Sequence, residues 1–281
     1  MTRFFYIFES TKKLIHKNDG FLKIVPFFIY FISIFPRFLG FAIPLKDSFH
    51  HGEPFAAAVN IWNRSEVIPN TIHGGLDFIP ALISRFFTSG DNYFYPTVYL
   101  TLIIFPAITG LIFLLFLRKI CGENNNIKTT IFLCGASITA QYLFTIRELF
   151  LIATLFSLFN YLNNSSNKEN NYDLSLLMLT TSVGCLWSFD RGLAGLSSVT
   201  LGLFVRSYFK KDIKYLKSLF IVLLSTLILI LFTKFFGLIN YFENISFLVQ
   251  TSSQWNYPWG ERTLAAASFL TLYVIFCIFI T

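Results

Sequence analysis

Residues 218–236 read SLFIVLLSTLILILFTKFF, a run in which only small hydroxyl side chains and Lys234 interrupt large apolar residues. As a helix, such a run is long enough to cross the ~30 Å hydrocarbon layer of a membrane. Similar runs recur along the 281 residues, and the chain is 54% hydrophobic, 19% aromatic and only 13% charged. That composition leaves too little polar surface for a water-soluble protein of this size. The sequence therefore predicts an all-α, polytopic membrane helix bundle.

The spacing of the apolar runs predicts about eight spanning helices in a single transmembrane domain over residues 1–281. We expect these spans near residues 24–45, 92–117, 129–145, 149–162, 174–189, 192–208, 218–236 and 263–280. Ahead of them, residues 1–20 mix phenylalanines with lysines and lack a small-residue cleavage site. This pattern favours an interfacial helix on the cytoplasmic face over a cleaved signal peptide.

The distribution of positive charge predicts the orientation. The formal net charge is +7, and in a membrane chain such an excess marks cytoplasmic loops more often than nucleic-acid binding. With a cytoplasmic N-terminus, fourteen Lys and Arg residues lie inside and seven outside, while Arg37 falls within the first span. We therefore expect a multi-pass protein of the inner (plasma) membrane with its N-terminus in the cytoplasm and no nucleic-acid partner.

The stretch 129–162 admits two interpretations, one long helix or two short helices that meet at Arg147–Glu148. A single helix would place two charges deep in lipid, at a cost of several kcal/mol. It would also move the basic loop from Arg206 to Lys217 to the outside, against the positive-inside rule. The sequence therefore favours two helices.

The connection over residues 46–91 is long and is expected to be extracytoplasmic. Pro54 directly after Glu53 predicts a helix over about 54–62, and residues 76–87 predict a second amphipathic helix. Ahead of the first helix, helical spacing would place Asp47 near His51 and His50 near Glu53. A hydrated polar loop explains the same residues, and a metal site is a weaker alternative because three or four convergent ligands are not visible.

Two adjacent pairs of charged residues fall between later spans. Arg147–Glu148 and Asp190–Arg191 each occupy the outer end of a predicted hairpin, so both pairs are expected on the same side of the membrane. Charges at a membrane boundary are more often functional than charges in water. The alternative is that each pair only caps its helices and neutralises itself.

The run HHGEPFAAAVNIWNRSEVIPNTIHGGLDFIPALIS, residues 50–84, resembles the first periplasmic loop of bacterial GT-C membrane glycosyltransferases. In that superfamily an acidic residue precedes a small–aromatic helix, a Gly-containing turn and a second helix, and Glu53 begins the same order here. WSFDRGLAG, residues 187–195, is also similar to a motif of such families. Gly52 stands where many members carry a second acid, and the chain is short for the superfamily. It is therefore expected to be an N-terminal module or a part that needs a partner membrane subunit.

The resemblance implies transfer of a sugar from a polyprenyl-phosphate carrier to a lipid, glycan or protein acceptor on the extracytoplasmic face. This chemistry needs a carboxylate to accept a proton and cations to stabilise the departing phosphate. The implied catalytic residues are Glu53 as general base and Asp47 as the second candidate. The implied substrate-binding residues are His50, His51, His73, Asp77, Arg147, Glu148, Asp190 and Arg191, with Asp190 orienting Arg191. The resemblance implies no particular cofactor, and a divalent Mg²⁺ or Mn²⁺ ion is a possible participant.

Two other functions compete with glycosyl transfer. A flippase or transporter for a lipid-linked sugar would carry charged or helix-breaking residues near the middle of the bilayer. A non-catalytic membrane subunit of a glycan assembly complex would fit the short chain. The position of the visible charges at the outer boundary favours the enzyme.

Overall fold

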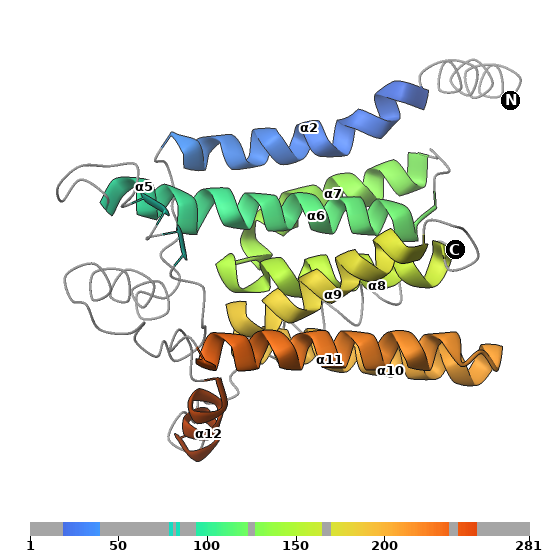
Figure 1. Cartoon of the computed structure of the whole chain (residues 1–281). Coiled ribbons are helices and arrows are strands. Elements are labelled where there is room, and N and C mark those ends of the chain that lie inside the picture. The colour runs from blue at the N-terminus through green and yellow to red at the C-terminus, as the bar shows by residue number, and fades with distance from the viewer. Residues whose placement is uncertain are drawn as a thin grey trace, which may run out of the picture. The chain divides into compact units, whose positions relative to one another are not determined.

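The computed structural model describes residues 19–39, 79–80, 83–84, 94–122, 127–164, 170–235 and 241–251. Within these ranges the chain is helical apart from short turns, and no strand occurs, which confirms the all-α prediction for this part of the chain (Figure 1). The contacts gather in two compact units. The described residues of the first unit are 19–39, 114–122 and 127–143, and those of the second are 79–80, 83–84, 94–113, 144–164, 170–235 and 241–251.

In the first unit, helix α2 (Asp19–Phe38) packs against helix α7 (Ile127–Leu143). The contact includes a hydrogen bond from Ser137 Oγ to the carbonyl oxygen of Pro26, at 2.8 Å. The opposite face of α2 exposes large apolar side chains, among them Phe28 and Phe35. A helix with polar interhelical contacts on one face and an aromatic outer face is typical of helices packed in lipid.

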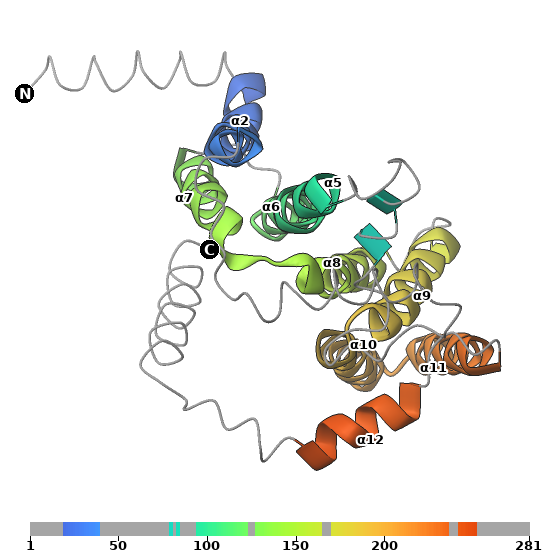
Figure 2. The ribbon, with the colours of Figure 1, turned by 90° about the vertical axis from the view of Figure 1, so that its left-hand side faces the viewer.

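The second unit contains four helices that lie side by side (Figures 1 and 2). They are α8 (Leu149–Asn164), α9 (Asn170–Trp187), α10 (Phe189–Lys210) and α11 (Lys214–Phe235). Helix α9 contacts the other three, and α10 also contacts α8 and α11. Because their connections are short, successive helices run in opposite directions. The start of α8, the end of α9 and the start of α10 therefore meet at one end, and the connection from α10 to α11 lies at the other.

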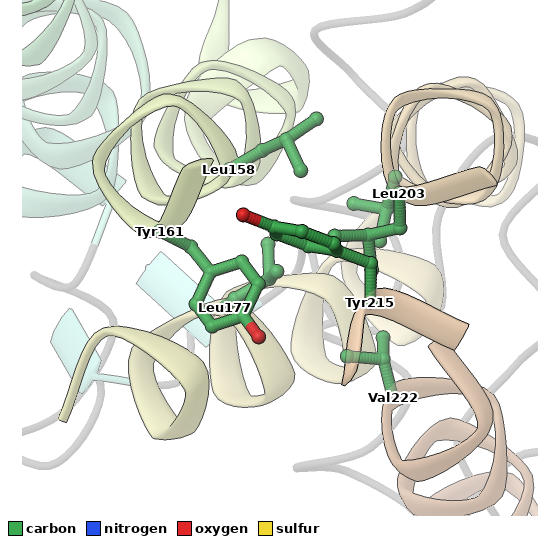
Figure 3. Packing of buried hydrophobic residues seen from close by; sticks show 7 residues of the cluster. Leu158, Tyr161, Leu177, Leu203, Tyr215 and Val222 are labelled. Atoms are coloured by element: carbon green, nitrogen blue, oxygen red, sulfur yellow. The ribbon is translucent and has the colours of Figure 1, made fainter. Parts of the chain in front are cut away.

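A core of apolar and aromatic side chains fills the space between these four helices (Figure 3). Its fully buried members come from all four helices: Leu158, Tyr161, Leu177, Val199, Leu203, Tyr215 and Val222. The phenol of Tyr161 shares a 2.6 Å hydrogen bond with Ser218 Oγ, which satisfies both hydroxyl groups in the interior.

Helix α5 (Phe94–Tyr99) continues through a π-helical turn, Leu100–Ile104, into α6 (Phe105–Ile120). Further along the chain, α12 (Tyr241–Thr251) follows α11 and is held by Tyr241, whose ring meets that of Phe189 edge-on at 5.2 Å. Residues of α6 and α12 thus pack on the end of the bundle where α10 begins.

The buried face of α11 is more polar than its exposed face. Its buried face alternates the hydroxyl residues Ser218, Thr226 and Thr233 with Tyr215, Val222 and Ile230. Large aliphatic and aromatic side chains such as Ile228 and Phe232 are more than half exposed. A water-soluble helix shows the reverse pattern. By length and composition, Leu100–Ile120 and Lys214–Phe235 are the two described helical stretches apolar enough to cross a membrane.

The predicted break at Arg147–Glu148 is confirmed. Helix α7 ends at Leu143, a short 3₁₀ turn covers Ile146–Glu148, and α8 begins at Leu149. The boundaries of later helices differ from the prediction because Ser188 alone separates α9 from α10. Asp190 therefore lies in the first turn of α10 and not in a connecting loop.

Several predicted segments lie outside the described residues: 1–18, the helix over 54–62 and the span over 263–280. Of the predicted helix over 76–87, only Ile79, Pro80, Ile83 and Ser84 are described, and they are helical. The expectation of about eight spans stays a prediction.

Leu203 and Leu201 on α10 provide a matched test of this packing. Leu203 is fully buried in the four-helix core, whereas Leu201 is 65% exposed. Replacing Leu203 by Ala should lower the free energy of unfolding by about 2–5 kcal/mol, because a cavity replaces well-packed methyl groups. The same change at Leu201 should cost much less. Thermal or denaturant unfolding of both variants in one detergent measures the difference, and equal losses would contradict the packing.

Candidate functional site: an ion quartet between two helix turns

The short turn before α8 is built on Thr145. Its backbone is extended, and its hydroxyl oxygen accepts a hydrogen bond from the backbone N–H of Arg147 at 3.2 Å. In return, Glu148 Oε2 accepts bonds from the backbone N–H and the hydroxyl of Thr145, at 2.8 and 2.5 Å. This reciprocal capping box fixes the Glu148 carboxylate, and its second oxygen, Oε1, is left to face a partner outside the turn.

The turn between α9 and α10 positions a second carboxylate. Ser188 is extended, and its hydroxyl donates to Asp190 Oδ1 at 2.9 Å. The same oxygen accepts the backbone N–H of Arg191 at 2.8 Å. An acid in the first turn of a helix is also favoured by the helix dipole. Asp190 is therefore held from both sides before any other charge is considered.

The four charged side chains of the two turns pair across the turns. Arg147 Nη2 lies 2.6 Å from Asp190 Oδ2, and Arg191 Nε lies 3.0 Å from Glu148 Oε1. Within the second turn, Arg191 Nη1 is 3.8 Å from Asp190 Oδ2, a longer contact. We call Arg147, Glu148, Asp190 and Arg191 the ion quartet. Each arginine thus makes its shortest ion pair with the turn that does not contain it.

An aromatic layer beneath the ion quartet joins the same two turns. The indole Nε1–H of Trp187 donates to the carbonyl oxygen of Ile146 at 2.9 Å. The Trp187 ring stacks on Phe105 of α6, with 5.7 Å between centroids, and contacts Phe150 of α8 at 5.1 Å. Because Trp187 and Ile146 are 4% and 3% exposed, this hydrogen bond is shielded from water. This aromatic layer packs apolar side chains against the two turns that carry the ion quartet.

Gly192, directly after the quartet, allows α9 and α10 to approach closely. A Cβ atom at this position would lie 2.4 Å from both Cys185 Cα and the carbonyl oxygen of Gly184. Both contacts are to backbone, which cannot rotate aside. Only glycine therefore fits between the helices here, and this close approach sets where Asp190 and Arg191 stand.

The quartet has a more buried half and a more accessible half. The side chains of Arg147 and Glu148 are 16% and 15% exposed, whereas those of Asp190 and Arg191 are 44% and 42% exposed.

Asp190 lies just outside the predicted membrane span over residues 192–208, and the surrounding charges shift its pKa. Burial by itself would raise the pKa of Asp190, but Arg147, Arg191 and the Ser188 hydroxyl together bring this pKa below its ordinary value.

This asymmetry limits the chemistry available at the quartet. A carboxylate with a lowered pKa stays ionised and is a weak base, so Asp190 suits positioning better than proton abstraction. The guanidinium of Arg191 has donor groups beyond its bond to Glu148 and is accessible, so it can receive an anionic oxygen.

The structure brings together four of the predicted site residues, Arg147, Glu148, Asp190 and Arg191. The other predicted site residues lie outside the described part of the chain: Asp47, His50, His51, Glu53, His73 and Asp77. Among the described residues, no group of three or more His, Cys, Asp or Glu side chains could hold a metal ion.

Sequence reasoning gave no role to four residues that build the site, Thr145, Trp187, Ser188 and Gly192, although the last three stand in the quoted motif WSFDRGLAG. The T-x-x-E spacing of Thr145 and Glu148 was a visible capping-box signal. The roles of the other three depend on contacts between helices distant in sequence. Comparison of the chain with protein-family models, with curated proteins and with solved structures finds no match.

Replacing Gly192 by Ala should destabilise the bundle by about 2 kcal/mol or more, because the added methyl group forces two backbones apart. Gly135 on α7 is the matched control, since a Cβ there meets nothing within 4 Å. Gly135→Ala should be neutral or stabilise by up to about 1 kcal/mol through helix propensity. Unfolding of both variants in the same detergent compares them. A Gly192 variant as stable as its control would refute the close approach.

Acid should weaken the quartet. The pKa of Asp190 is lower in the folded protein than in the unfolded chain. The contribution of Asp190 to stability is therefore complete above the ordinary aspartate pKa of about 4, and it is lost as the pH falls through the pKa of Asp190 in the folded protein. Asp190→Asn should therefore lower stability at neutral pH and flatten the fall in stability as the pH drops below the ordinary aspartate value of about 4. Unfolding midpoints of both proteins across this range test the assignment. Parallel curves would contradict it.

Proposed function

We propose that the protein is an integral membrane glycosyltransferase of the GT-C type that uses a polyprenyl-phosphate-linked sugar at the extracytoplasmic face of the inner membrane. The observation that carries the proposal is the ion quartet, in which two turns 43 residues apart in sequence meet at one end of a helical bundle. The exposed apolar faces of α10 and α11 support placement in lipid.

Opposite charge distributions at the two ends of the bundle support the orientation. The quartet contains two cations and two anions, so its formal charge is zero. The other end carries Arg206, Lys210, Lys211, Lys214 and Lys217. By the positive-inside rule the basic end belongs in the cytoplasm, which supports the proposed external position of the quartet, and the charge bias of the whole sequence supports the proposed cytoplasmic N-terminus.

In the proposed reaction, Arg191 binds the phosphate of the lipid carrier and stabilises the charge that grows on it as the sugar leaves. Arg147 and Ser188 hold Asp190, and Asp190 and Glu148 hold Arg191. Glu53 is the proposed general base, with Asp47 as the second candidate. The remaining proposed contacts to substrate come from His50, His51, His73 and Asp77. A divalent Mg²⁺ or Mn²⁺ ion is a possible participant in this reaction.

A non-catalytic subunit of a membrane assembly is the second candidate. It is favoured by the internal neutralisation of the quartet, because paired charges at helix ends can serve only to join two turns. The four-helix bundle gives a transporter less support. Within α8, and over residues 174–187, 192–205 and 218–233 of the other three helices, there is no Asp, Glu, Lys, Arg or His, whereas transport sites near mid-bilayer usually carry such groups.

Replacing Arg191 by Gln should reduce sugar transfer by about 100-fold, the usual cost of removing one donor to a developing anion. Glu53→Gln should reduce it at least as much, since the proton acceptor is lost. Lys234→Gln, at an exposed cation on the same end of the bundle, should leave the rate unchanged. Membranes containing each variant would be supplied with radiolabelled polyprenyl-phosphate hexoses and pentoses, and transferred label counted.

The comparison also separates the competing functions. Undetectable transfer by the unmodified protein would favour the non-catalytic subunit. Normal transfer by the Glu53 and Arg191 variants would remove the catalytic assignment while leaving the fold untouched.

A further inference from the structure

The end of the second unit opposite the ion quartet forms a strongly basic surface. Between residues 206 and 217 the chain carries Arg206, Lys210, Lys211, Lys214 and Lys217 and a single acid, Asp212. We call residues 206–217 the basic hairpin. Its formal charge of five cations minus one anion is +4.

The single acid of the basic hairpin is occupied within the turn. Asp212 Oδ1 accepts the backbone N–H of Lys214 at 2.9 Å and so caps the start of α11. Within the part of the chain that the structure describes, no ion pair joins Lys210, Lys211 or Lys217 to a carboxylate. The basic hairpin therefore differs from the quartet, where every arginine has an acidic partner.

The turn holds these cations in a fixed arrangement. Lys211 ends α10 in the left-handed conformation, with φ 50°, and its backbone N–H donates to the carbonyl oxygen of Ser207. The hydroxyl of Ser207 in turn donates to the carbonyl oxygen of Asp212 at 3.0 Å. Because the turn is short and internally bonded, the backbone atoms of the lysines stay close together and their like charges repel one another. An external anion would relieve this repulsion.

Arg206 adds a cation at the base of the hairpin. Its Nη2 donates to the carbonyl oxygen of Leu162 on α8 at 3.3 Å, which fixes the guanidinium against the bundle. Its Nε is buried and has no hydrogen-bond partner among the described residues. The guanidinium is thus anchored, and among the described residues no ion pair joins it to a carboxylate.

Exposed apolar side chains interleave with the cations. Tyr208, Phe209 and Ile213 are 74%, 77% and 65% exposed, and the two aromatic rings contact each other edge-on at 5.6 Å. Aromatic and cationic side chains mix in this way at the boundary between lipid tails and headgroups. A surface for nucleic acid or an acidic protein would not need three exposed apolar residues in the same turn.

We propose that the basic hairpin binds the phosphate groups of anionic phospholipids in the leaflet that faces it. This proposal depends on the membrane location in the proposed function but not on sugar transfer. A lysine close to an anionic surface strengthens binding by about fivefold. The four lysines and Arg206 together should therefore enrich anionic lipid around the protein relative to zwitterionic lipid, and the enrichment should weaken as salt is raised.

The test uses the full-length protein in nanodiscs that contain phosphatidylcholine mixed with phosphatidylglycerol. Native mass spectrometry counts the phosphatidylglycerol retained by the protein as the lipids are stripped. Replacing Lys210, Lys211, Lys214 and Lys217 together by Gln should reduce the retention at least about tenfold. Replacing the same four residues by Arg keeps the charge and should preserve it. Lys234→Gln, at the other end of α11, should also preserve it.

The possible results separate anionic-lipid binding from its alternatives and from the proposed reaction. Equal retention by the unmodified protein and the four-Gln variant would overturn the proposal while leaving membrane insertion intact. Binding of a double-stranded oligonucleotide, without a preference for phosphatidylglycerol, would assign the surface to nucleic acid and overturn it as well. Failure of the unmodified protein to enter any bilayer would overturn the membrane location and this proposal together. Loss of sugar transfer alone would bear only on the proposed reaction.

Discussion

The crossed pairing of Arg147 with Asp190 and of Glu148 with Arg191 is the interaction on which the candidate site depends. Two of these side chains are about 15% exposed, and a charge in such surroundings is stable only with a well-placed partner. Each turn directs its shortest ion pair to the other, and the contact within the second turn is longer, at 3.8 Å. The requirement for pairing therefore joins the start of α8 to the start of α10, and the hydrogen bond from Trp187 to Ile146 reinforces the same link.

The remainder of the second unit follows a different rule. Hydroxyl groups such as those of Tyr161 and Ser218 bond to each other inside the bundle, while large apolar side chains cover its outside. In lipid, where helix association gains little from burying apolar surface, interior polar contacts and close packing at positions such as Gly192 stabilise the bundle. The two ends then differ in charge: one holds the internally paired and partly accessible ion quartet, and the other carries the basic hairpin with its formal charge of +4.

Much of the helical architecture could be predicted, because the length of an apolar run directly indicates the length of the helix it forms. Helix α11 closely matches the predicted span 218–236, and the break at Arg147–Glu148 followed from the cost of charges in lipid. The crossed pairs could not be predicted, since adjacent residues of opposite charge give no sign of which distant partner each will choose. The single-residue turn at Ser188 and the close approach at Gly192 depend on how two helices pack against each other. The periodicity of apolar residues in the sequence does not indicate this packing.

The central claim is that the bundle spans a membrane with the ion quartet outside and the basic hairpin inside. Single cysteine substitutions at Lys234, near the end of α11, and at Lys211, in the turn before α11, test it in intact cells with a membrane-impermeant thiol reagent. Both positions are exposed, and the unmodified protein gives the background. The account predicts labelling at position 234 in intact cells and at position 211 only after permeabilisation. Labelling of both positions from one side, or the reverse pattern, would contradict it.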